Sequence, residues 1–162
     1  MKARHISWLA LFTALSVVGG MLKVPAPVSS VALDSFPALL AAGLLGAVPG
    51  ALVGAFGHLI SALMGGMPLG PLHALIAAEM AAIMWLFGWL YARGKRFFSL
   101  TVFVLLNGLV SPAPFILLMG WPFYVGMVLS LMIASLVNGV IGALLLPRLL
   151  PVYERLIGRV RA

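Results

Sequence analysis

The stretch PLHALIAAEMAAIMWLFGWLYARGKR, residues 71–96, decides the fold class. Its first part, residues 71–92, is apolar apart from His73 and Glu79, and it begins with a proline, which suits the first position of a helix. About 20 apolar residues in a helix cross the hydrocarbon core of a membrane. The basic string RGKR follows directly, as is typical of the cytoplasmic end of such a helix. The stretch therefore predicts a transmembrane helix with a known direction.

The composition extends this prediction to the whole chain. Of its 162 residues 64% are hydrophobic and only 8% are charged, whereas about a quarter of the residues of a soluble domain are charged. Long apolar runs dominate and strand-like alternation is absent, so helices rather than a barrel are expected to span the lipid. The sequence has no cysteine, which excludes disulfides, thiol catalysis and cysteine-ligated zinc. We expect an all-α integral membrane protein.

Proline- and glycine-rich segments divide the remaining apolar runs. The first run is not read as a signal peptide, because no small-residue cleavage site ends it. We expect two prolines, Pro112 and Pro114, to interrupt the fifth span and Pro147 to end the last one. The prediction is one transmembrane domain, residues 1–162, with six spans at about 6–22, 35–45, 47–64, 71–92, 99–119 and 123–146.

The charges fix the orientation of these six spans. With both termini in the cytoplasm, nine of the ten basic residues fall on the cytoplasmic side and only Lys23 falls outside. Five spans would separate the basic cluster at 93–96 from the basic tail. The net charge of +7 is therefore interpreted as topology and not as a nucleic-acid surface. The nine residues are Lys2, Arg4, Arg93, Lys95, Arg96, Arg148, Arg155, Arg159 and Arg161.

The few polar side chains left within or beside the spans are informative, because such groups are costly in lipid and usually face a cavity. Except for Asn138, which is deep in the inner half, they collect in the outer half of the predicted bundle. That asymmetry predicts a cavity that opens to the outside. The candidate binding residues are Asp34, His58, His73, Glu79, Asn107, Ser111 and Trp121.

The acid and histidine candidates each carry a structural alternative. Asp34 is also suited to cap a helix N-terminus. His58 follows two glycines at helical spacing, a small face that packs against another helix, and His73 can be a loop-edge residue. Glu79 is the only acid inside a predicted span, so it needs a partner or a proton, which favours a functional role.

The remaining candidates have equally simple alternatives. Asn107 and Ser111 share one helix face and can serve hydrogen bonds between helices. Trp121 and its neighbour Tyr124 can be aromatic residues of the membrane interface.

No enzyme motif emerges from the sequence. It has no His-Glu-x-x-His pair, no Gly-x-Ser-x-Gly elbow and no phosphate-binding loop. His58, His73 and Glu79 match no metal-ligand spacing, so neither a metal nor a cofactor is expected. The sequence also lacks an ATPase domain, so a partner must supply the energy for uptake against a gradient. A small membrane enzyme and a proton-coupled transporter with Glu79 as its relay stay open as other classes.

Three segments form a recognisable pattern: VALDSFPALL at 31–40, LLGAVPGALVG at 44–54 with its repeated glycines, and the glycine-rich loop at 65–70. They resemble the substrate-binding S components of energy-coupling factor (ECF) transporters. The Ala10 and Ala14 pair in the first helix is similar to the small-residue motif with which S components dock onto the T component. The resemblance covers essentially the whole chain.

Within this family the segments at 23–38 and 65–73, together with Glu79, look most like S components assigned to α-ribazole, a cobamide precursor. Riboflavin S components share a related start of the second helix, so riboflavin or another vitamin stays open. The resemblance implies a vitamin-binding subunit in the plasma membrane of a prokaryote, with a T component and two cytoplasmic ATPases as partners. It also implies that the loops at 23–33 and 65–70 are lids and that the subunit topples in the membrane.

Overall fold

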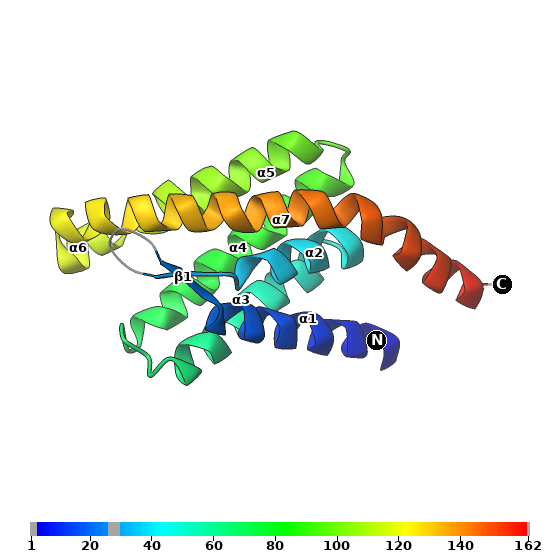
Figure 1. The fold of residues 1–162 in the computed structure, drawn as a ribbon, viewed down its shortest axis with the longest axis horizontal. Helices are drawn as coiled ribbons and strands as arrows, with labels where there is room; N and C mark the ends of the chain where they lie inside the picture. Colours follow the sequence, from blue (N-terminus) through cyan, green and yellow to red (C-terminus); the bar gives the residue numbers. More distant parts are fainter. Residues whose placement is uncertain (1–2, 26–29, 162) are drawn as a thin grey trace.

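The computed structural model describes the backbone of residues 3–25 and 30–161, and the side chains of residues 5–22 and 32–156. Its helices pass back and forth between two ends of an elongated bundle (Figure 1). Part of the expected lid at 23–33, residues 26–29, lies outside the described residues. The helices are α1 (Ala3–Met21), α2 (Ser35–Leu45), α3 (Ala47–Met64), α4 (Leu72–Ala92), α5 (Arg96–Leu105), α6 (Phe115–Met119) and α7 (Trp121–Arg161).

The prediction of an all-helical membrane fold is confirmed, with one addition. Four helical segments are long and apolar enough to cross a membrane by length and composition, namely residues 47–64, 72–92, 96–119 and 121–156. Two shorter apolar helices, α1 and α2, complete six passes. The addition is a short antiparallel hairpin between β1 (Lys23–Pro25) and β2 (Ser30–Ala32), with Lys23 paired to Ala32.

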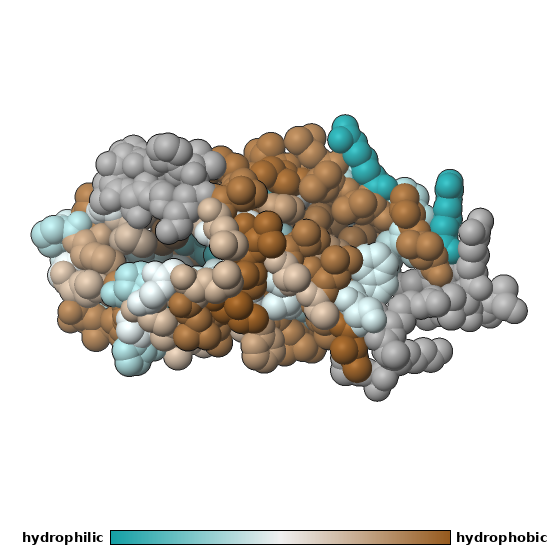
Figure 2. Space-filling model, turned by 60° about the horizontal axis from the view of Figure 1, so that its bottom comes forward, coloured by the Kyte–Doolittle hydropathy of each residue, from teal (hydrophilic) through white to brown (hydrophobic). Residues whose placement is uncertain are grey.

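Both termini lie at one end of the bundle, together with the α4–α5 turn (Figure 1). The hairpin, the α3–α4 loop and the α6–α7 turn lie at the other end. Figure 2 shows apolar residues across the middle of the molecule and strongly hydrophilic side chains at the end that carries the termini. Because basic flanks favour the cytoplasm, this end is the cytoplasmic one, and we call the opposite end the outer end.

α2 is the shortest pass and the most deeply buried. Its 11 residues rise about 16 Å, roughly half of the hydrocarbon thickness. Residues 37–42 are all buried, and Leu39 packs in one core with Phe87, Phe103 and Leu146. α2 and α3 have the residue bounds that the sequence predicted for them, separated by Gly46 at a φ of 106°.

Glycines bring α3 close to its neighbours. A Cβ at Gly50 would lie 2.6 Å from the Cα of Ala42 in α2, and one at Gly54 would lie 2.9 Å from Cγ of Met84 in α4. The predicted small face of α3 is therefore a packing face, as is common between membrane helices. His58 lies one turn beyond Gly54 on the same helix, so its ring reaches α4.

The fifth pass is broken by a π-helical turn, Leu106–Val110, between α5 and α6. The Ser111 amide donates to the Leu106 carbonyl five residues back, at 2.8 Å. Pro112 and Pro114 follow, and a proline lacks an amide proton and collides with the carbonyl four residues before it. The wider turn makes room for Pro112 and leaves Asn107 and Ser111 buried, in a type of turn that is frequent at functional sites.

The expectation that Pro147 ends the last helix is wrong. α7 continues through Pro147 and Pro151 over 41 residues and bends in this part (Figure 1). Both prolines are exposed and lie four residues apart on one face. A missing hydrogen bond on an exposed face bends a helix without ending it. The extension packs against α1 through Tyr153 and Trp8, whose rings lie 5.7 Å apart, edge to face.

Candidate functional site

The outer end of the bundle contains two adjoining cavities of about 190 and 170 Å³. We call the first the slot and the second the side compartment. They share His58, Ile76, Asn107, Met127 and Leu131, so they lie side by side. The other residues of the slot are Leu69, His73, Glu79, Ser111, Pro112, Phe115 and Phe123, and those of the side compartment are Ala32, Asp34, Ser35, Met80, Ser130 and Ala134.

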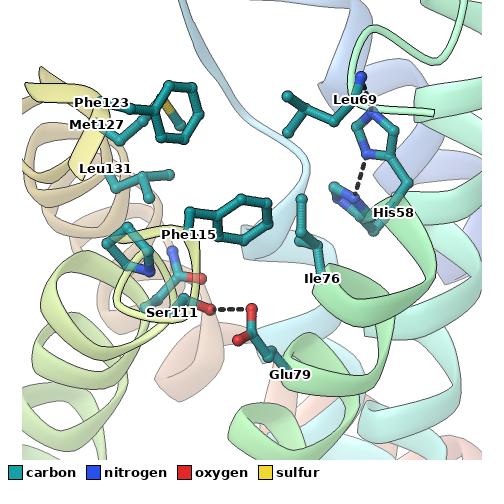
Figure 3. Close-up of a pocket in the computed structure, with 12 residues that line it drawn as sticks. His58, Leu69, Ile76, Glu79, Ser111, Phe115, Phe123, Met127 and Leu131 are labelled. Atoms are coloured by element: carbon teal, nitrogen blue, oxygen red, sulfur yellow. Dashed lines mark hydrogen bonds between the residues drawn. The ribbon is translucent and has the colours of Figure 1, made fainter. Parts of the chain in front are cut away.

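The slot has two apolar walls and a polar floor (Figure 3). Phe123, Met127 and Leu131 of α7 form one wall, with the ring of Phe115 from α6 beside them. Leu69 and Ile76 stand opposite. The centroids of the Phe115 and Phe123 rings lie 6.0 Å apart. Such walls suit a flat aromatic ligand, which gains most from apolar contact on both faces.

The floor of the slot is a carboxylate held by a hydroxyl. Ser111 Oγ donates to Glu79 Oε2 at 3.0 Å, across the gap between α4 and the turn after the π-helix (Figure 3). Among the described residues, Glu79 Oε1 has no hydrogen-bond partner and Glu79 forms no ion pair. This oxygen is therefore ready to bind a polar group of a ligand.

His58 and His73 form a pair that reaches the glycine-rich loop. The Leu69 amide donates to His73 Nε2 at 3.4 Å, and His73 Nδ1 lies 3.1 Å from His58 Nε2. An amide can only donate, so His73 Nε2 is the acceptor and a neutral His73 carries its proton on Nδ1. With that proton, His73 Nδ1 donates a hydrogen bond to His58 Nε2. The loop and α3 are thus joined through one imidazole at the mouth of the slot.

Asn107 joins the π-helical turn to α7. Its Nδ2 donates to Ser135 Oγ at 2.8 Å, and Ser135 Oγ donates to the Leu131 carbonyl at 2.6 Å. The interhelical role that the sequence left open for Asn107 is therefore present. The same side chain lines both cavities.

Asp34 precedes α2 but its side chain does not cap that helix. Asn138 of α7 does so from across the bundle, because its Oδ1 accepts from the Phe36 amide at 2.8 Å. Its Nδ2 also donates to the Ala32 carbonyl at 3.0 Å. The Asp34 carboxylate is left to accept from Ser35 Oγ at 3.1 Å through Oδ1 and to line the side compartment.

Six of the seven candidate residues therefore line these two adjoining cavities: Asp34, His58, His73, Glu79, Asn107 and Ser111. Trp121 does not join them. It is the first residue of α7, its side chain is 61% exposed, and its ring packs on Tyr124 at 5.2 Å, outside both cavities.

Sequence reasoning missed the aromatic wall, Phe115 and Phe123, and the positioning residue Asn138. Phe115 follows Pro114 and Phe123 follows Pro122, so both aromatic residues lie next to a predicted turn at the outer end. This position was the sequence feature that could have indicated a binding wall. Asn138 is 1% exposed in an otherwise apolar stretch. Such an amide needs partners, but the sequence does not say which. Within the described residues no group of three or more His, Asp or Glu side chains is placed to hold a metal.

A separate groove runs along the outside of α1. Ala10 and Ala14 are exposed and line it, with Leu52, Phe56 and Ile60 of α3 on the other side. Its volume is about 690 Å³ and its lining is almost wholly apolar. Small residues in α1 leave room there for another helix.

A membrane bundle with cavities of mixed polarity at its outer end has the features of a small-molecule binding subunit. The chain matches the family profile "ECF transporter, substrate-specific component" over residues 4–152, and it belongs to that family. It is a multi-pass protein of the prokaryotic plasma membrane, a transport subunit and not an enzyme, and it works with an ECF module. The comparison with curated proteins gave no significant match.

Proposed function

We propose that this substrate-specific component binds α-ribazole from outside the cell and delivers it to the ECF transporter. The observation that carries the proposal is the slot, with Phe115 and Phe123 on one side, Ile76 on the other and Glu79 at its floor. A benzimidazole ring suits apolar walls, and its free ring nitrogen, which accepts a hydrogen bond, can pair with Glu79 when either the nitrogen or the carboxylate carries a proton. The resemblance of residues 23–38 and 65–73 to α-ribazole S components supports the same ligand.

Binding by the purified protein tests the ligand. We expect α-ribazole to bind in the nanomolar range in a calorimetric titration, and mass spectrometry to find it as the copurifying small molecule. No heat, together with no competition against the copurified compound, would reject α-ribazole. A yellow preparation with bound riboflavin would assign the slot to that vitamin and keep the family function.

The proposal includes docking through the α1 groove. Ala10 and Ala14 are the exposed small residues in it, and the T component's coupling helices are the proposed occupant. Toppling of the whole subunit would then carry the loaded cavity across the membrane, with two ATPases as the power source. Ala14→Trp fills the groove and lies far from the slot, so we expect assembly with the T component to fail while ligand affinity is kept.

The matched control for docking is Ala82→Trp. Ala82 is exposed on α4 and lines neither cavity nor the α1 groove. Both variants add the same ring to a lipid-facing helix, so a general effect of bulk would appear in both. Equal copurification of Ala14→Trp and the parent with the T component would remove α1 from this role.

A further inference from the structure

The side compartment contains a buried hydroxyl that the protein leaves without a partner. Ser130 of α7 is 4% exposed, and its Oγ makes no hydrogen bond to the described residues. A serine in a helix commonly donates to the carbonyl four residues back, as Ser135 does to Leu131, but Ser130 does not. An unsatisfied buried hydroxyl costs about 1–3 kcal/mol. Ser130 lines the compartment, so a ligand group there can remove this cost once the serine turns its hydroxyl toward it.

The second polar group of the side compartment is the Asp34 carboxylate, which accepts hydrogen bonds but cannot donate them. Asp34 accepts from Ser35 through Oδ1, and among the described residues its Oδ2 has no hydrogen-bond partner. An ionised carboxylate oxygen only accepts hydrogen bonds, whereas a serine hydroxyl both donates and accepts. Together the two side chains offer one acceptor and one donor–acceptor, which matches two neighbouring hydroxyl groups of a ligand.

The positions of these groups are fixed without any help from a ligand. Asn138 holds both Ala32 and the start of α2 against α7, so Asp34 and Ser130 face the same compartment from different elements. No Lys or Arg side chain lines either cavity in the described part of the chain. Apart from His58, the described lining of the side compartment offers no cation beside Asp34, so it suits hydrogen-bond donors better than an anion.

We infer that the side compartment is a hydroxyl-recognition site, in which Asp34 and Ser130 bind the diol of a ribosyl or other polyhydroxy group while the slot holds the ring. Ser130 is then a specificity-determining residue for ring compounds that carry a sugar. This inference rests on the proposed function for the identity of the ring as benzimidazole. The division into a ring site and a diol site applies equally to another vitamin that joins a flat ring to a polyhydroxy group.

The test is a cycle of two ligands and two proteins. The ligands are α-ribazole and its base without the ribose, and the proteins are the parent and Ser130→Ala. Ser130 makes no hydrogen bond in the described structure, so its removal takes none from the fold. We expect the base to bind about 100-fold more weakly than α-ribazole to the parent, because several hydrogen bonds are lost. Ser130→Ala should weaken α-ribazole about tenfold and the base less than about twofold.

Ser61→Ala is the matched control. Ser61 of α3 is the other buried hydroxyl without a partner among the described residues, and it lies beside Gly20 of α1, outside both cavities. The same substitution there should leave both affinities unchanged. Equal weakening of the two ligands by Ser130→Ala, or no weakening of either, would overturn the diol site and leave the α-ribazole proposal standing.

A wrong assignment of α-ribazole as the ligand would be seen separately, as absence of α-ribazole binding to the parent protein. If α-ribazole does not bind, the cycle is run with riboflavin and lumiflavin, which share a ring system and differ in the polyhydroxy chain. A selective loss of riboflavin affinity in Ser130→Ala would support the diol site with another ring in the slot. If no member of either pair binds, both the ligand assignment and the diol site are overturned.

Discussion

Replacing Asn138 by Leu should loosen the whole outer end of the protein. Leu is similar in size, so it leaves no large cavity, but it removes the acceptor of the Phe36 amide and the donor to the Ala32 carbonyl. Two part-buried backbone groups then lose these partners, and each costs up to about 1–3 kcal/mol. We therefore expect a loss of about 2–6 kcal/mol in the free energy of unfolding. For a chain of this size 1 kcal/mol corresponds to roughly 2–4 °C in Tm.

Thermal unfolding in detergent measures this loss, with an expected fall in Tm on the order of 5–20 °C. Ligand affinity should fall as well, by more than about tenfold, because Asp34 is no longer held at the side compartment. Asn138→Asp keeps an acceptor for the Phe36 amide and loses the donor to Ala32, so we expect an intermediate Tm.

The control for this prediction is Ser99→Ala. Ser99 is as deeply buried as Asn138, but its hydroxyl donates only to the nearby Arg96 carbonyl, at the cytoplasmic end. Its loss should cost about 1 kcal/mol and leave binding unchanged. A Tm for Asn138→Leu within about 2 °C of the parent would refute the reasoning, because two unpaired backbone groups cannot be that cheap.

Two further predictions concern the ligand. Phe115→Ala should weaken α-ribazole binding by about 10-fold or more, because a buried wall of the slot is lost, whereas Trp121→Ala should change the Kd less than about threefold. Equal losses in the two variants would put the stacking partner outside the slot. The phosphate ester of α-ribazole should bind at least about 100-fold more weakly than α-ribazole in a competition titration, since Asp34 and Glu79 face it and no described Lys or Arg side chain lines either cavity. Equal competition by the ester would show that a cation reaches the ligand.

Much of the fold could be predicted because lipid imposes simple rules. Apolar length and basic flanks indicate where helices run and in which direction, and the bounds of α2 and α3 followed from Asp34, Gly46 and the loop at 65–70. Of the local proline rules, the interruption at Pro112 and Pro114 was predicted correctly and the end of a helix at Pro147 was not. Pro112 is accommodated by a π-helical turn and Pro147 by a bend, since what a proline does depends on which face of the helix it occupies.

The candidate site could be predicted only at residues whose side chains are unfavourable in lipid unless they have a partner or a function. Glu79, His58 and His73 stand out in an apolar sequence because an unpaired polar group is unfavourable in lipid. Phe115 and Phe123 are apolar residues among many others, so only the tertiary structure shows that they form a wall. Likewise the capping of α2 by Asn138 joins residues 102 positions apart, and no local pattern contains that partnership.

Because α7 is one continuous helix, it connects the slot mechanically with the cytoplasmic end of the protein. One arm carries Phe123 and Met127 at the slot, and the other carries Tyr153 against α1 at the cytoplasmic end. From Trp121 to Leu146 the helix is about 40 Å long, so a tilt of about 10° around its inner end moves the wall of the slot by roughly 7 Å. A partner that pushed on α7 beside α1 would therefore be expected to move the wall of the slot, and the bend near Pro147 and Pro151 would set how stiffly the push is transmitted.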